Sequence, residues 1–215
     1  MVRKKAGTLL SLPDFFSIFS LPRKLNVDTA ALEKAFYAQS RKLHPDRFAS
    51  KSAEEQEAAL AQASQLNDAY RALKEPIART EYLLSLEGVQ MEEQSRAATD
   101  AARANNTAKK QVAPPELLEE AFELNMQLEE MRMNKKMGED DPQLGKDLNA
   151  AKANFEGMLA NAQAELEKLW AAWDAALDAS DSAAQDKAKD GMVALLNRRS
   201  YIRNLVRDVN EALEA

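Results

Sequence analysis

The 215-residue sequence contains no cysteine and only one histidine, His44. The lack of cysteine excludes disulfides, thiolate metal sites and a cysteine nucleophile. A zinc site would need Asp and Glu as its remaining ligands, which is uncommon, and a Ser–His–Asp triad could use only His44. The sequence also has no glycine-rich phosphate loop beside this histidine. We therefore expect a protein that is not an enzyme and holds no metal and no cofactor.

Long apolar runs are also missing from the sequence. No stretch approaches the ~18 residues of a membrane span, so we expect no membrane partner. The basic start, "MVRKKAGTLL", has too short an apolar stretch for a signal-peptide core. We expect residues 1–12 to be a frayed terminus, with a targeting remnant as the alternative. A bacterial cytoplasm is the expected location, in preference to a mitochondrial matrix.

Charge is distributed unevenly along the chain. Residues 1–51 hold 10 Lys/Arg and 4 Asp/Glu, a net charge of +6. Because the whole chain has a net charge of −6, the remaining residues together carry −12. A basic N-terminal region of this kind favours an acidic partner, either nucleic acid or an acidic protein surface. The acidic remainder and the few aromatic residues argue against nucleic acid.

The first part of the chain reads as a series of helices. Residues 13–22 predict one or two helical turns, and longer helices are expected over 27–43, 52–75 and 76–88. The two longest are joined by a short loop and should form an antiparallel hairpin. The tip of that hairpin is the segment "KLHPDRF", residues 42–48, where Pro45 disfavours helical geometry at His44.

The second part is also helical. Residues 89–113 have little apolar periodicity and predict a linker. Three amphipathic helices are expected after it, over 114–133, 146–178 and 183–213, and they should form a three-helix bundle. The predicted fold is therefore all-α, with an N-terminal domain over 13–88 and a C-terminal domain over 114–215.

Several helix starts carry residues that cap backbone N–H groups. Asp28 is the expected N-cap of the helix over 27–43. Ser52 with Glu55, and Ser182 with Gln185, have the spacing of a capping box.

His44 and Asp46 admit three interpretations. Catalysis would need a pocket and further reactive groups, which the hairpin tip does not supply. The two residues could serve only to stop one helix and turn the chain. They could also form a rigid docking loop, whose neighbours Arg41, Lys42 and Arg47 would attract an acidic surface.

This combination of residues resembles a J domain, the module of DnaJ-type co-chaperones. The resemblance lies in a helix with a basic face, then "HPDRF", then a long helix containing "LNDAYRALKEP". The segments "FFSIFSLP" and "PIARTEYLLSLEG" are similar to segments of HscB-type proteins, as is the order of a J domain and a three-helix bundle. The resemblance is close over 13–88 and mainly architectural over 114–213.

The resemblance implies that the protein stimulates ATP hydrolysis by a DnaK- or HscA-type chaperone. It also implies delivery of an IscU-type iron–sulfur scaffold protein to that chaperone, for cluster assembly and transfer. The residues implied to bind the chaperone are His44, Pro45, Asp46, Lys34, Arg41, Lys42 and Arg47.

The helix over 114–133 has two apolar stripes. The first would face the bundle core and consists of Leu117, Ala121, Leu124, Leu128 and Met131. The second consists of Leu118, Phe122 and Met126, centred roughly 140° away at 100° per residue. Both stripes could be buried if the N-terminal domain docked on the bundle; otherwise the second is an exposed partner site.

The resemblance supports the exposed alternative. It implies a scaffold-binding surface made of Leu118, Phe122, Glu123, Glu130 and Tyr201. Met126 departs from the family, in which an acidic residue is typical. The nearby residues Trp170 and Trp173 have helical spacing and are expected in the core or at its rim.

Other readings remain open. The protein could be a J-domain protein that serves a different client. Only Leu118, Phe122 and Tyr201 distinguish this alternative from an IscU-type client. A nucleic-acid binder and a purely structural helical adaptor are alternatives from other classes, and self-association is possible.

Overall fold

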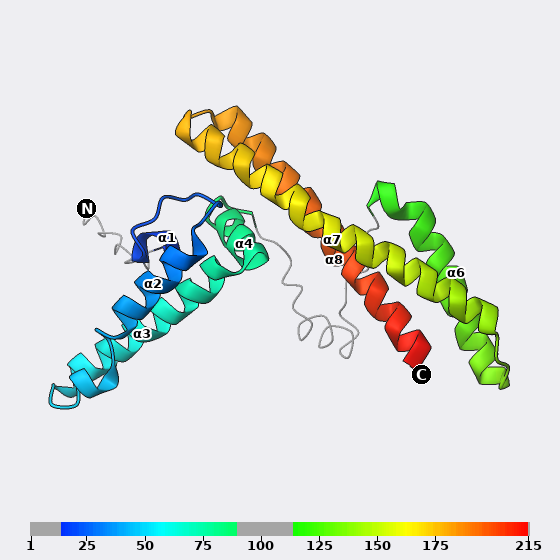
Figure 1. Cartoon of the computed structure of the whole chain (residues 1–215), viewed down its shortest axis with the longest axis horizontal. Helices are drawn as coiled ribbons and strands as arrows, with labels where there is room; N and C mark the ends of the chain where they lie inside the picture. Colours follow the sequence, from blue (N-terminus) through cyan, green and yellow to red (C-terminus); the bar gives the residue numbers. More distant parts are fainter. Residues whose placement is uncertain (1–13, 90–113, 215) are drawn as a thin grey trace, which may run out of the picture. The chain divides into compact units, whose positions relative to one another are not determined.

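The computed structural model describes residues 14–89 and 114–214, and these are helical without any strand (Figure 1). This confirms the all-α prediction for the described part of the chain. The chain divides into two compact units, Met1–Leu86 and Glu87–Ala215. The predicted frayed terminus at 1–12 lies outside the described residues, as does the predicted linker apart from residue 89.

The first unit is built on an antiparallel pair of helices, α2 (Thr29–Ser40) and α3 (Ala53–Lys74). Short elements flank the pair: α1 (Phe15–Ile18) before it, the 3₁₀ turn η1 (Pro45–Arg47) at its tip and α4 (Pro76–Leu86) after it. Figure 1 shows η1 at the far end of the hairpin from α1 and α4.

Capping residues fix where α2 and α3 begin. The Asp28 carboxylate accepts from the N–H groups of Ala30 and Ala31. The Ser52 hydroxyl accepts from the Glu55 N–H, and the Glu55 carboxylate accepts from the Ser52 N–H, so this capping box is confirmed.

The end of α2 differs from the prediction. The helix stops at Ser40 and not at residue 43. The Lys42 N–H donates to the Gln39 carbonyl three residues back, and the Leu43 N–H is shared between the carbonyls of Gln39 and Ser40, with the shorter distance to Ser40. Tightening of this kind is common at a helix end, and here it leads into the extended backbone before Pro45.

Aromatic pairs join the helices of the first unit around its core. Phe36 on α2 stacks on Tyr70 of α3 with ring centroids 4.2 Å apart. Phe15 of α1 stacks on Tyr82 of α4 at 4.2 Å, and its N–H donates to the Tyr82 hydroxyl at 2.9 Å. The core beneath is formed by Phe16, Leu25, Leu32, Leu66, Leu73, Leu83 and Leu84. These contacts pack α2 against α3 and α1 against α4.

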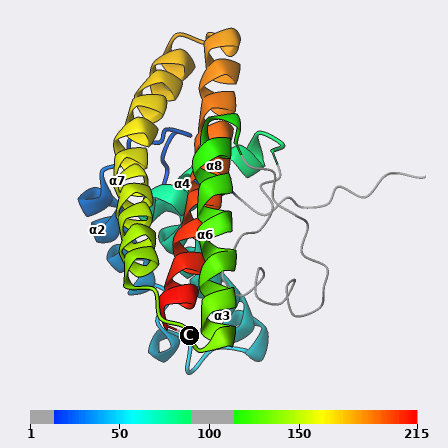
Figure 2. The ribbon, with the colours of Figure 1, turned by 90° about the vertical axis from the view of Figure 1, so that its right-hand side faces the viewer.

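The second unit begins with the turn η2 (Pro115–Leu117), followed by α6 (Leu118–Met137), α7 (Pro142–Asp178) and α8 (Ser182–Glu214). Figure 2 shows α6 running alongside the adjoining halves of α7 and α8. Their shared core contains Leu117, Ala121, Leu124, Leu128, Met131, Leu144, Leu148, Phe155, Ile202, Leu205, Val209 and Ala212. The predicted three-helix packing is therefore present, but over part of the unit only.

The remainder of α7 and α8 is a two-helix hairpin, because α6 has 20 residues whereas α7 and α8 have 37 and 33. Trp170 and Trp173 are buried, in agreement with a core role. The two helices approach closely at Gly191, where an added Cβ would lie 2.7 Å from Cδ2 of Leu169.

Helix boundaries in the second unit differ from the prediction. The helix expected from residue 114 begins at Leu118, because the preceding residues form the 3₁₀ turn η2. α6 continues to Met137 and ends at Gly138, whose φ of 73° suits a left-handed C-cap. α7 begins earlier than residue 146, at Pro142, and is capped by Asp141. At α8 the Asp181 carboxylate accepts from the Ala184 N–H, so Asp181 takes the capping role that was expected of Ser182.

Candidate functional site

The tip of the α2–α3 hairpin presents His44, Pro45 and Asp46 to solvent on a short, ordered turn. The Arg47 N–H donates to the His44 carbonyl, and the Phe48 N–H to the Pro45 carbonyl, each at 2.9 Å. Pro45 starts the turn with its ring-fixed φ, and its missing N–H costs no bond there. The His44 and Asp46 side chains are 59% and 88% exposed. A constrained backbone thus presents exposed side chains, as a docking loop requires.

His44 also stabilises the turn that it precedes. Its Nδ1 accepts the Asp46 N–H at 3.3 Å and lies 3.4 Å from a carboxylate oxygen of Asp46. Both contacts join the ring of His44 to the turn that follows it.

Four predicted cationic residues lie along α2 and at the turn and are exposed: Lys34, Arg41, Lys42 and Arg47. None forms an ion pair with another described residue. Lys34 and Arg41 are seven positions apart and share one face of α2. At about 100° per residue, that face lies opposite Leu32 and Phe36, which pack inward. The structure thus places unpaired positive charge along α2 and at the turn, where it can attract an acidic surface.

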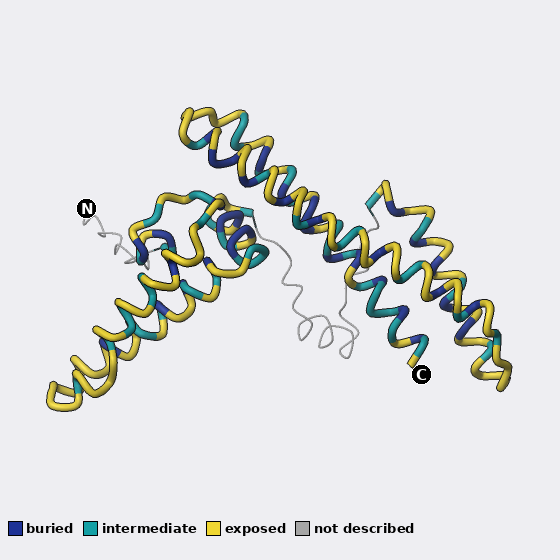
Figure 3. Tube along the Cα trace, viewed as in Figure 1, coloured by how far each residue is buried: buried dark blue, intermediate teal, exposed yellow. Residues whose placement is uncertain are grey.

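A second exposed surface lies on α6, in the other unit. Leu118 and Phe122 are 55% and 68% exposed, and Met126 is exposed as well. The buried residues of α6 lie toward its other side, about 140° around the helix. Figure 3 shows this division along α6, with exposed and buried residues alternating by turn. Within the second unit, nothing described covers this apolar stripe.

The apolar stripe is longer than the sequence suggested. Met133 and Met137 are also exposed and fall within the same arc of about 100° as Leu118, Phe122 and Met126. Met137 was missed because the helix was predicted to end at residue 133. Gly138 was the available signal for the true end, since glycine is the usual left-handed cap. We call these five residues the α6 apolar face.

The remaining predicted scaffold-binding residues have different surroundings. Glu123 and Glu130 are exposed and lie beside the α6 apolar face. Tyr201 on α8 is only half-exposed and packs against the three-helix core. Burial, followed by the charge of Asp208, raises the pKa of the Tyr201 hydroxyl, so this group stays neutral at physiological pH.

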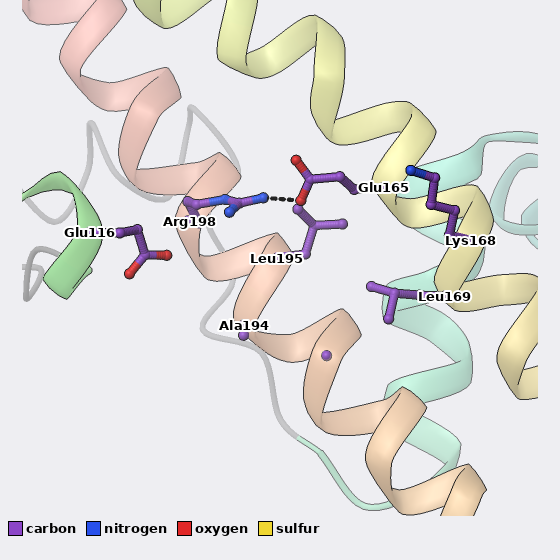
Figure 4. A pocket seen from close by; sticks show the side chains of 8 residues that line it. Glu116, Glu165, Lys168, Leu169, Ala194, Leu195 and Arg198 are labelled. Carbon is purple, nitrogen blue, oxygen red and sulfur yellow. Dashed lines mark hydrogen bonds and ion pairs between the residues drawn. The ribbon is translucent and has the colours of Figure 1, made fainter.

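The second unit also contains an open pocket of about 340 Å³ between α7, α8 and η2 (Figure 4). Its charged groups include both signs, and Arg198 pairs with Glu165 across it. None of the predicted site residues lines this pocket.

Within residues 14–89 and 114–214 there is no group of three or more His, Asp or Glu side chains that could hold a metal ion. No helix there is sufficiently long and apolar to cross a membrane.

Comparison with known proteins supports the assignment of the first unit. A family model for the DnaJ domain matches residues 14–82, which include the turn and all four cationic residues. Two solved structures resemble the whole chain. Chaperone HscB from Vibrio cholerae is 26% identical, with 89% of this chain and 96% of that chain covered, and a TM-score of 0.49. Human co-chaperone protein HscB is 22% identical, with coverage of 92% and 82% and a TM-score of 0.51.

The DnaJ match covers the hairpin and its turn, and a J domain implies a chaperone of the Hsp70 type as partner. The human structure shares the fold over 92% of this chain. Residues 14–82 are therefore a DnaJ domain, and the chain shares the fold of the human co-chaperone HscB.

Proposed function

We propose that the protein stimulates ATP hydrolysis by a DnaK- or HscA-type chaperone through His44, Pro45 and Asp46. The observation that carries the proposal is the turn itself: a capped, exposed tripeptide at the tip of a rigid hairpin, inside a DnaJ domain. Stimulation requires that docking favours the hydrolysing state of the chaperone over its other states. A rigid loop suits this task, because contacts must differ between states and a flexible loop would adapt to both.

The cationic residues around the turn would guide association. Lys34 and Arg41 extend the positive surface along α2, and Lys42 and Arg47 bracket the turn. Exposed charges of this kind raise the rate of encounter with an acidic surface and fix orientation more than they add affinity.

The α6 apolar face would hold the client, for which we propose an IscU-type iron–sulfur scaffold protein. Support comes from the exposure of Leu118 and Phe122 and from the neighbouring carboxylates of Glu123 and Glu130. An apolar strip bordered by acids favours a partner with an apolar patch flanked by basic residues. The half-exposed Tyr201 would contribute at the edge. The protein would then bring the client and the chaperone together, and hydrolysis would trap the client on the chaperone.

The test of the chaperone role is single-turnover ATP hydrolysis by an HscA-type chaperone, with the native chain and with His44→Gln. Acceleration by the native chain that falls to the unstimulated rate with the variant is the expected result. No acceleration of a demonstrably active chaperone would exclude the proposed role. Addition of the scaffold should increase the stimulated rate further if it is the client.

A different client is the second candidate, and one observation favours it. Three of the five residues of the α6 apolar face are methionines, Met126, Met133 and Met137. Flexible, polarisable methionine side chains are common on surfaces that accommodate several partners. Titration of the native chain with a purified IscU-type scaffold decides between the candidates, because the second predicts no saturable binding.

A further inference from the structure

The methionines of the chain are divided sharply between surface and core. Met126, Met133 and Met137 are 61%, 48% and 64% exposed, and all three lie on α6. Met131 and Met192 are buried, and Met158 is half-buried. Among the described residues, exposed methionine is therefore confined to a single face of a single helix.

That face is the one proposed to bind the client. Met126 lies one helical turn after Phe122, and Met133 and Met137 continue the same arc toward the end of α6. The full α6 apolar face runs from Leu118 to Met137, 19 residue steps or about 28 Å of helix. The three thioethers supply its apolar surface from Met126 onward, so their chemical state changes how apolar that part of the face is.

Methionine is also the main target for a peroxide on this protein. The chain has no cysteine, whose thiolate would otherwise compete for the oxidant. Residues 14–89, which include the turn at His44, contain no methionine. Oxidation in the described part of the chain would thus fall on the second unit and, by exposure, on α6.

We propose that Met126, Met133 and Met137 are an oxidation-sensitive modification site that controls client binding, an inference that rests on the proposed client role of α6. A hydroperoxide transfers one oxygen to the thioether sulfur: the O–O bond breaks, an S=O bond forms, the sulfur loses two electrons, and hydrogen peroxide is reduced to water. The resulting sulfoxide is polar and strongly accepts hydrogen bonds.

The change acts on binding and leaves the fold intact. The three side chains point away from the buried stripe of Leu124 and Leu128, so their oxidation creates no cavity and buries no polar group in the free protein. In a complex, the sulfoxides would be pressed against an apolar partner without a hydrogen-bond donor, which is unfavourable. We expect affinity for the client to fall by about tenfold.

The test oxidises the full chain alone with dilute hydrogen peroxide, removes the peroxide, and then measures scaffold binding by calorimetry. Peptide mass spectrometry should show Met126, Met133 and Met137 oxidised well before Met131 and Met192. Binding should weaken about tenfold, and methionine sulfoxide reductases of both stereospecificities should restore it. Stimulation of the chaperone without scaffold should be unchanged, because residues 14–89 have no methionine to oxidise.

The matched variant is Met126→Leu with Met133→Leu and Met137→Leu, which keeps apolar side chains but removes the oxidisable sulfur. The affinity of this variant for the scaffold is measured before and after peroxide treatment. The ratio of the two affinities should be close to one. A loss equal to that of the native chain would overturn the inference, since other methionines would then be responsible. Unchanged affinity of the oxidised native chain would overturn it as well.

These outcomes separate the inference from the proposed function. If the reduced native chain does not bind the scaffold at all, the client role and this inference fail together. If the reduced chain binds and the oxidised chain binds equally well, only this inference fails.

Discussion

The Nδ1 atom of His44 lies 3.3 Å from the backbone nitrogen of Asp46, so the histidine caps the turn that carries it. This side chain therefore has a structural contact within the turn and an exposed ring edge that remains available to a partner. Substitutions can separate these two contributions.

His44→Asn should retain a fold close to native and lose stimulation of the chaperone. Asparagine is a good capping residue and can still accept the Asp46 N–H, but it lacks the imidazole ring. Single-turnover hydrolysis measures the loss, and circular dichroism with thermal unfolding measures the fold. Because the site is exposed, stability should change by no more than about 0.5 kcal/mol. Full stimulation by this variant would show that the cap, and not the ring, is what the chaperone requires.

Lys34→Ala and Arg41→Ala should each weaken association with the chaperone by about two- to fivefold, with the loss mainly in the association rate. The reason is that each removes one exposed positive charge from the same face of α2. Surface plasmon resonance at several salt concentrations measures the effect, which should shrink as salt is raised. Lys146→Ala is the matched control, because it removes an exposed charge from α7. An equal loss in this control would point to net charge as the cause.

Phe122→Ala should reduce scaffold affinity by about 30-fold or more, as expected for a large side chain at the centre of an interface. Leu118→Ala should have a smaller effect in the same direction. Leu60→Ala on α3 is the control, since Leu60 is an apolar residue of the same 68% exposure as Phe122 but lies in the other unit. Calorimetric titration gives the affinities. Equal affinity for Phe122→Ala and the native chain would remove α6 as the binding surface.

Gly157→Ala and Gly191→Ala should differ in stability although both lie inside long helices. Alanine is favoured over glycine in a helix by about 1 kcal/mol, and a Cβ at Gly157 would meet no atom within 4 Å. At Gly191 the new Cβ would displace Leu169, so part of that gain should be lost. Urea unfolding followed by fluorescence measures both, because the only tryptophans, Trp170 and Trp173, lie on α7. A larger gain at Gly191 would contradict the close approach of α7 and α8.

Asp14→Ala should lower the free energy of unfolding at pH 7 by about 1 kcal/mol. Its carboxylate accepts the Ser17 N–H at 2.8 Å and pairs with Arg23 at 2.8 Å. Burial by itself raises the pKa of Asp14. The Ser17 hydrogen bond and the contact with Arg23 together lower this pKa by more than burial raises it, so the folded pKa lies below the ordinary value.

The sign of this shift fixes the pH dependence. A carboxylate with a lowered folded pKa stabilises the protein above its unfolded pKa, about 3.9, and loses that contribution as pH falls through the folded pKa. The difference between the native chain and Asp14→Ala should therefore shrink in acid, as measured by urea unfolding with circular dichroism. Asp14→Asn is the control that retains the cap acceptor and loses the charge.

Local signals in the sequence predicted most elements of the fold. The capping residues Asp28 and Ser52 mark the starts of α2 and α3, and the stripe around Leu124 marks the buried side of α6. These features depend on residues a few positions apart, which is why pattern alone reveals them.

Features that depend on competition between neighbours were less predictable. Ser182 and Asp181 are both good capping residues, and only the backbone path decides which one faces the free N–H groups. How far α6 packs along α7 and α8 depends on where α6 ends. It ends at Met137, with Gly138 as its cap, four residues beyond the predicted end at residue 133. The same error hid Met137 and thus the full length of the α6 apolar face. Half-burial of Tyr201 arises from the packing of α8 on α6 and α7, which no single stretch encodes.

The hydrogen bonds within the turn have a consequence for the free energy of binding. Two backbone hydrogen bonds, from Arg47 and Phe48, and the contact from the Asp46 N–H to the His44 ring already fix the backbone of the turn before any partner arrives. Ordering a residue on binding costs about 1–2 kcal/mol of backbone entropy, so a partner that docks here meets a loop for which most of this cost has already been met by folding.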